Sequence, residues 1–363
     1  MQVTIVGLPG SGKTTVFNAL TGGHAETGGF SGGRAAPNVG VVKVPDERLD
    51  RLAALFHPRK TIPADVTYVD VAIPAGAARE GTIAADVLAQ IRNADALLHV
   101  ARAFEAGGPE APDAWRDVAE LDTEFTVADL DMIEKRLEKL RTSGRHGTPA
   151  EREANAQEDE LLARLEPDLS RGQPLRALKL SDEDERRLRG YRFLTQKPVL
   201  VVLNIDEGQL AQAAALEADG RARHPQPESD VVALAGKIEA ELAELSTDDA
   251  ALFMEDLGIS EPSRGRVIRL TYALLGLFSF FTAGEDECRA WTLKRGATAV
   301  DAAGTIHSDL ARGFIRAEVI SYPDLIACGS TAEARKRGLL RSEGKTYEVR
   351  DGDVIEVLFN VAR

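Results

Sequence analysis

The sequence predicts an α/β protein with a doubly wound sheet, an inserted pair of helices and a small mixed α+β module at its end. Short apolar runs alternate with helical patterns over residues 1–105, as in sheets that helices cover on both faces. Residues 113–195 contain no convincing strand, and short alternating strands follow Phe281. The predicted domains are 1–112 with 196–280, 113–195, and 281–363.

Each element of the sheet domain is predicted from local periodicity. Runs of four to six apolar residues bounded by turn residues indicate buried strands, and apolar residues on one helical face indicate helices. The predicted strands are 3–6, 39–44, 66–71, 96–101, 198–203 and 231–234. The predicted helices of this domain include 15–20, 46–56, 82–94 and 263–278.

Composition narrows the class of protein. A chain of 363 residues is long for one core, so two or three domains are expected. A net charge of −14 argues against wholesale wrapping of nucleic acid, although a local basic patch is compatible with it. Cys288 and Cys328 have neither metal nor redox spacing, which indicates a reducing compartment. The most apolar run, 272–281, is too short to span a bilayer, so we expect no membrane partner.

Residues 7–14 match the phosphate-binding pattern G-x-x-x-x-G-K-[ST] without a mismatch, between a predicted strand and a predicted helix. Glycines let backbone N–H groups curl around an anion, and the helix N-terminus adds partial positive charge. We predict that Lys13 reaches the outer phosphates and that the Thr14 hydroxyl binds Mg²⁺. The nucleotide-contacting residues predicted here are Pro9, Gly10, Ser11, Gly12, Lys13, Thr14 and Thr15.

A carboxylate, Asp70, ends the predicted strand after this loop. An acidic group at this position of a phosphate-binding domain holds Mg²⁺, commonly through water. A strand-end aspartate is also often a helix cap, but the preceding phosphate loop favours the metal role for Asp70.

A candidate base-binding segment follows the strand 198–203, at the edge of the sheet where ligands collect. GTPases have Asn-Lys-x-Asp there, and the aspartate pairs with guanine. This chain has Asn204, then Ile205 in place of the lysine and Glu207 in place of the aspartate. These substitutions weaken the guanine interpretation without establishing adenine, because a carboxylate aimed at adenine N1 would be unpaired. Backbone N–H groups at Ala235 and Gly236 are further candidates for base contact.

The block 113–195 predicts an inserted helical hairpin. Apolar residues over 130–140 follow the 3-4-3 spacing of a coiled-coil seam, and Thr148 begins a capping box for a second helix. Ser181 is expected to cap a third helix that runs towards Leu194. Basic residues flank the turn, which leaves a solvated helix face and a phosphate-contacting tip both open. They are Lys135, Arg136, Lys139, Arg141 and Arg145.

Several segments resemble the YchF / Obg-like ATPase family of P-loop proteins. Residues 37–40 and 46–49 resemble its switch-I exit, 91–96 its fourth-strand entry, and 204–207 its Asn-x-x-Glu base motif. The segments 289–292, 303–307, 313–318 and 343–345 resemble its TGS domain, a ubiquitin-like β-grasp module. The resemblance spans nearly the whole chain and implies ATP preference over GTP, Mg²⁺ dependence, a cytoplasmic location and association with ribosomes or RNA.

Departures from that family are concentrated where hydrolysis would occur. Arg34 aligns with the switch-I threonine, and Ile73 replaces the glycine of an Asp-x-x-Gly motif. Pro74 removes the next backbone N–H, and the loop 105–109 lacks the family's histidine. Arg34 is therefore either a catalytic replacement, acting as an arginine finger in cis, or a solvent-facing loop residue.

Together these features predict an ATP-binding, Mg²⁺-dependent P-loop NTPase that hydrolyses ATP slowly, with Lys13 and Arg34 as catalytic candidates. We expect a monomer whose hairpin and TGS domain engage a ribosome or RNA. Two alternatives remain open, a nucleotide-dependent adaptor that does not hydrolyse and a genuine GTPase.

Overall fold

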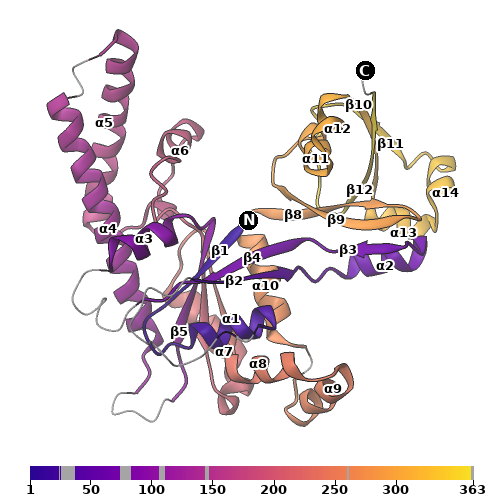
Figure 1. Cartoon of the computed structure of the whole chain (residues 1–363), viewed down its shortest axis with the longest axis horizontal. Coiled ribbons are helices and arrows are strands. Elements are labelled where there is room, and N and C mark those ends of the chain that lie inside the picture. Colours follow the sequence, from indigo (N-terminus) through magenta and orange to yellow (C-terminus); the bar gives the residue numbers. More distant parts are fainter. Residues whose placement is uncertain are drawn as a thin grey trace. The chain divides into compact units, whose positions relative to one another are not determined.

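The computed structural model describes residues 1–23, 25, 37–73, 83–105, 111–143, 147–259 and 261–360. The chain divides into two compact units, the first made of residues 1–40 and 67–267 and the second of residues 41–66 and 268–363. Figure 1 labels the elements of both units. Among the described helices, none has the length and apolar character needed to cross a membrane.

The first unit is built on a six-stranded sheet of order β2-β4-β1-β5-β6-β7. Its strands are β1 (Gln2–Val6), β2 (Asn38–Lys43), β4 (Asp65–Asp70), β5 (Ala96–Arg102), β6 (Val199–Asn204) and β7 (Ser229–Leu234). From β4 to β7 neighbouring strands pair in parallel. Parallel strands need crossover connections, which here are helices, so the predicted α/β sheet is confirmed.

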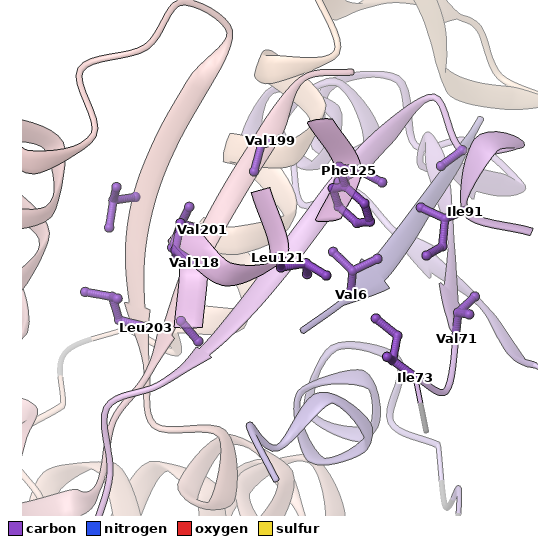
Figure 2. Packing of buried hydrophobic residues seen from close by; sticks show 14 of the residues in the cluster. Val6, Val71, Ile73, Ile91, Val118, Leu121, Phe125, Val199, Val201 and Leu203 are labelled. Carbon is purple, nitrogen blue, oxygen red and sulfur yellow. The ribbon is translucent and has the colours of Figure 1, made fainter. Parts of the chain in front are cut away.

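Helices cover this sheet and bury its apolar side chains. They are α1 (Lys13–Thr21), α3 (Ala85–Arg92), α4 (Ala114–Ser143), α7 (Ala213–Arg223), α8 (Gly236–Glu244) and α9 (Thr247–Asp256). The next helix, α10 (Ser263–Leu274), begins in the first unit and ends in the second. Figure 2 shows Leu121 and Phe125 of α4 packed over strand residues such as Val6 and Val201. Only alternate strand residues enter this cluster, because successive side chains of a strand point to opposite faces.

A helical hairpin extends from this unit, formed by α4 and α5 (Pro149–Ser170) (Figure 1). The Thr148 hydroxyl and the Glu151 side chain form the predicted capping box at the start of α5. The predicted seam is buried, with Ile133, Leu137 and Leu140 packed in one cluster with leucines of α5.

The third helix, α6 (Asp182–Leu188), starts at the predicted cap Ser181 but does not run to Leu194. The helix ends at Leu188 with Arg189 as its C-cap, and Arg192 beyond it adopts a left-handed conformation with φ 52°. The N–H groups of Leu194 and Thr195 then donate to the Asp129 carboxylate of α4, at 3.1 and 2.8 Å. The prediction for this end was wrong because long-range hydrogen bonds replaced helical ones.

The second unit is a six-stranded sheet of order β11-β10-β12-β8-β9-β3. Its strands are β3 (Lys60–Ile62), β8 (Leu277–Ala283), β9 (Glu287–Lys294), β10 (Phe314–Ser321), β11 (Arg341–Glu343) and β12 (Asp353–Phe359). Its helices are α2 (Glu47–Phe56), α11 (Ala299–Ile306), α12 (Ser308–Arg312), α13 (Tyr322–Cys328) and α14 (Thr331–Lys336). Phe280 and Ala303 belong to its buried core, as the predicted mixed α+β module requires.

The segment 41–66 differs from its predicted place in the nucleotide-binding domain. Its strand β3 pairs in parallel with β9, and its helix α2 packs against β8, β9 and α13. Leu49 and Leu52 of α2 are buried there. Local periodicity identified the helix correctly, but its apolar face packs on a sheet more than 200 residues away in sequence.

The boundary predicted at 281 also differs. The helix expected over 263–278 ends at Leu274, Gly276 adopts a left-handed φ of 66°, and β8 begins at Leu277. The apolar run 272–281 therefore contains the end of a helix and the start of a strand, which periodicity cannot separate in a short apolar stretch.

Candidate nucleotide and metal site

The loop between β1 and α1 depends on its glycines, some for their backbone conformation and some for close packing. Gly10 and Gly12 have left-handed φ values of 82° and 86°. A Cβ at Gly12 would lie 2.2 Å from Nδ2 of Asn204, so a larger residue would collide with the side chain that ends β6. Glycine is therefore needed at position 12 for both conformation and close approach, and at position 10 for conformation.

Lys13 begins α1 and folds back over this loop. Its Nζ donates hydrogen bonds to the carbonyl oxygens of Gly7, at 2.9 Å, and Leu8, at 3.1 Å. Burial lowers the pKa of Lys13 to about 8, and the nearby charge of Asp70 opposes that shift. The Lys13 ammonium group is thus held mainly by neutral carbonyls. A bound phosphate would supply the negative charge that stabilises a buried ammonium.

Asp70 ends β4 beside the start of α1. Its Oδ2 accepts hydrogen bonds from the Thr14 hydroxyl, at 2.9 Å, and from Nδ2 of Asn38, at 3.3 Å. Its Oδ1 is buried and has no hydrogen-bond partner within the described part of the chain. A buried carboxylate oxygen without a partner calls for an explanation, and an ion or its water is one.

The oxygen donors at this point suit Mg²⁺, which binds carboxylate and hydroxyl oxygens and keeps several waters. Thr14 and Asp70 are therefore brought together as predicted, and the residues present fit the metal. Over the described residues, no three or more histidine, cysteine or acidic side chains gather into a group that could hold a metal ion. Binding of Mg²⁺ by Thr14 and Asp70 accordingly stays a prediction.

Asn204, at the end of β6, connects the loop to a second segment of the candidate site. Its Nδ2 donates to the carbonyl oxygen of Ser11, at 2.9 Å, and its Oδ1 accepts from the N–H of Gly236, at 3.1 Å. This side chain therefore ties the phosphate loop to the segment after β7. The N–H of Gly236, predicted to contact the base, has this acceptor instead, and Ala235 is buried.

The two residues that were expected to distinguish bases lie in different environments. Ile205 is 3% exposed and belongs to the core cluster, so its side chain packs against the protein. Glu207 is exposed at the start of a 3₁₀ helix (Glu207–Gln212) that Asp206 caps. The assignment of Glu207 as a base contact stays a prediction, whereas Ile205 supports the site through the core.

Several predicted features of the hydrolytic side fall outside the described residues, namely Arg34, Pro74, Arg145 and the loop residues 106–109. Ile73 is described, and it is 1% exposed within the core cluster (Figure 2). A β-branched, buried side chain here takes the place of the flexible glycine that the resemblance implies at this position.

Comparisons with known proteins agree with this geometry. A family model described as "50S ribosome-binding GTPase" matches residues 2–139, and the model YchF-GTPase_C, described as "Protein of unknown function (DUF933)", matches residues 277–360. A Bacillus subtilis protein named "Ribosome-binding ATPase YchF" is 38% identical over 365 residues, which cover 98% of each chain. The chain belongs to the YchF family.

Other YchF proteins support the same assignment. The Haemophilus ducreyi relative with that name is 40% identical over 367 residues, again covering 98% of each chain. A solved structure of the Schizosaccharomyces pombe YchF GTPase superposes with a TM-score of 0.84 at 26% identity, covering 99% of this chain and 97% of that one. The resemblance stated from the sequence is therefore confirmed, and so is the fold class.

Two site residues were missed by the sequence interpretation. Asn38 reaches Asp70, although only its place in a family-like segment had been noted. Phe104 lies beside the loop, with Cε1 3.7 Å from the position of a Cβ at Gly12. The available signal for Phe104 was its place just after the strand β5 (Ala96–Arg102), at the edge of the sheet where ligands collect.

Proposed function

We propose that this protein is an Mg²⁺-dependent P-loop NTPase that binds ATP in preference to GTP, hydrolyses it slowly and engages a ribosome or RNA. The observation that carries the proposal is the convergence of Lys13, Thr14 and Asp70 on one side of the phosphate loop. A lysine, a hydroxyl and a carboxylate in this arrangement match the parts that phosphoryl-transfer enzymes use for phosphates and metal.

Each residue has a separate task in this proposal. The loop glycines present backbone N–H groups to the phosphates, and Lys13 supplies positive charge to the outer ones. Thr14 and Asp70 would hold Mg²⁺, which neutralises developing negative charge on the phosphates. Asn204 fixes the loop against β6 and the segment after β7, which keeps these donors in place.

Slow hydrolysis follows from the other end of the nucleotide. Ile73 is buried where the family pattern has a glycine, so its segment lacks that residue's freedom to turn an N–H towards the γ-phosphate. Loss of a transition-state donor costs about 10²–10³ in rate in other enzymes. Turnover by the isolated protein is therefore expected well below the typical rate of about 10 s⁻¹.

The proposed partner rests on names and on charge. The curated YchF relatives reported above carry the name "Ribosome-binding ATPase", and the helical hairpin has exposed basic residues near its turn, Lys139 and Arg141 among them. Basic groups that contact phosphates make binding to RNA dependent on salt. We assign the protein to the cytoplasm, as a monomer, in the same proposal.

GTP hydrolysis is the second candidate function. The matched description of residues 2–139 and the name of the fission-yeast structure both refer to a GTPase. Glu207 carries a carboxylate at the position where GTPases use one for guanine. Direct competition between ATP and GTP separates the two candidates.

Lys13→Ala tests the site itself. Loss of an ion pair and hydrogen bond to the phosphates should weaken ATP binding by about 30-fold or more, equal to about 2 kcal/mol. Lys43→Ala, which removes an exposed lysine at the end of β2, is the matched control and should bind normally. Isothermal titration and circular dichroism measure affinity and folding together. Unchanged ATP affinity in a folded Lys13→Ala protein would reject the assigned site.

A further inference from the structure

Asn38 is the first residue of β2, and its side chain is directed at the metal-site carboxylate. It donates through Nδ2 to Oδ2 of Asp70, at 3.3 Å, the same oxygen that accepts from Thr14. Residues 26–36 precede it outside the described part of the chain. The hydrogen bond of Asn38 therefore connects the start of β2 with the end of β4.

We infer that Asn38 is a positioning residue that orients the Asp70 carboxylate for Mg²⁺, an inference that rests on the proposed function. Two hydrogen bonds to Oδ2 fix the rotation of the carboxylate about its Cβ–Cγ bond. The other oxygen, Oδ1, is then left buried and without a partner among the described residues, which is the oxygen available to a metal ion or its water.

The donors on Oδ2 differ in what they can do when metal is bound. The Thr14 hydroxyl has one proton and two lone pairs, so it can donate to Asp70 while its oxygen faces Mg²⁺. The Asn38 amide nitrogen can only donate, so its hydrogen bond to Asp70 does not compete with metal binding. Asn38 can therefore hold the carboxylate in both states without becoming a metal ligand.

Packing gives no competing reason for an asparagine at this place. Asn38 is exposed, and asparagine is among the residues that strands disfavour. Its neighbour Val39 is 61% exposed on the same strand and is not part of the hydrogen-bonding group at Asp70. Substitution of Asn38 is thus expected to leave folding intact, and Val39 offers a matched control.

The test compares nucleotide binding with and without metal. ATP affinity is measured by isothermal titration in Mg²⁺ and in EDTA for the unsubstituted protein and for Asn38→Leu, Asn38→Ser and Val39→Thr. Leucine keeps the size of the side chain but removes the donor, and serine is too short to reach Asp70. Melting temperature, read by circular dichroism, reports on folding in each case.

In Mg²⁺ we expect both Asn38 variants to bind ATP roughly three- to tenfold more weakly than the unsubstituted protein. This is the loss expected when one hydrogen bond to a partly exposed charged group is removed. Affinity in EDTA and melting temperature should stay unchanged, and Val39→Thr should match the unsubstituted protein throughout. An equal loss in Mg²⁺ and EDTA would show a general structural role and overturn the inference.

Equal Mg²⁺ dependence in Asn38→Leu and the unsubstituted protein would also overturn it, and would leave the proposed function standing. By contrast, an unsubstituted protein whose ATP affinity does not respond to Mg²⁺ would overturn the proposed metal dependence and this inference together. The response of the unsubstituted protein to Mg²⁺ therefore distinguishes a failure of the proposed function from a failure of this inference alone.

Discussion

The buried histidine of β5 predicts a loss of stability in mild acid. His99 is 1% exposed, and burial lowers its pKa to about 4, with the charges of His224, Arg176 and Lys13 acting in the same direction. The nearby Asp122 carboxylate opposes the shift. In an unfolded chain the imidazole titrates near pH 6.5.

The direction in which stability changes with pH follows from the protons that the folded and unfolded chains bind. Above pH 6.5 His99 is neutral in the folded and unfolded states, so it adds no pH dependence. As the pH falls from 6.5 towards 4, the unfolded chain binds a proton that the folded chain excludes, and the free energy of unfolding falls. From pH 7 to pH 5 the two pKa values give a loss of about 2 kcal/mol.

Replacement of His99 by leucine should remove this contribution. Urea unfolding at pH 7, 6 and 5 measures the slope of stability with pH, and the slope is compared rather than the absolute stability, which a core substitution also changes. The chain has two tryptophans, one in each unit, so a Trp291→Phe background lets the fluorescence of Trp115 report on the first unit.

An exposed histidine serves as the control. His57→Asn replaces an exposed side chain at the left-handed C-cap of α2, a conformation that asparagine tolerates, and should leave the slope of the first unit unchanged. If His99→Leu loses as much stability between pH 7 and pH 5 as the unsubstituted protein, burial of a neutral His99 is not the cause and the reasoning is refuted.

Three further predictions concern the core, the second unit and the hairpin. Ile73→Gly with Pro74→Leu should raise ATP turnover by restoring a flexible N–H. Loss of the buried Ile73 side chain should at the same time lower the free energy of unfolding by about 3 kcal/mol. A double mutant that folds yet hydrolyses ATP no faster would contradict the expected rise in turnover. Arg48→Met should destabilise the second unit by about 1 kcal/mol in urea, because the guanidinium binds Asp46 and Asp351, and an unchanged midpoint would show that these ion pairs contribute nothing. Arg141→Glu should weaken ribosome co-sedimentation and reduce its salt dependence; equal pelleting at all salt concentrations would favour a solvated helix face.

Much of the nucleotide domain follows from short-range sequence patterns. The strands of the sheet and the capping box at Thr148 were predictable because alternation, apolar runs and caps are local properties. The meeting of Thr14 with Asp70 was predictable too, since parallel strands bring their carboxyl ends to one edge.

What the sequence did not reveal depends on contacts between distant segments. The pairing of β3 with β9 joins residues more than 200 positions apart, and no local pattern encodes it. The end of α6 is set by hydrogen bonds to Asp129, a residue of another helix. The sequence placed Asn38 only in a segment that resembles the family's switch-I exit, and its hydrogen bond to Asp70 joins residues 32 positions apart.

The base preference of the site is measured most directly by competition binding. ATP and GTP compete for the unsubstituted protein in Mg²⁺, alongside the Glu207→Asp protein, whose shorter carboxylate restores the acidic residue of the GTPase motif. The account predicts that the unsubstituted protein binds ATP more tightly and that Glu207→Asp reduces this preference. Tighter binding of GTP by tenfold or more, equal to about 1.4 kcal/mol, would contradict it.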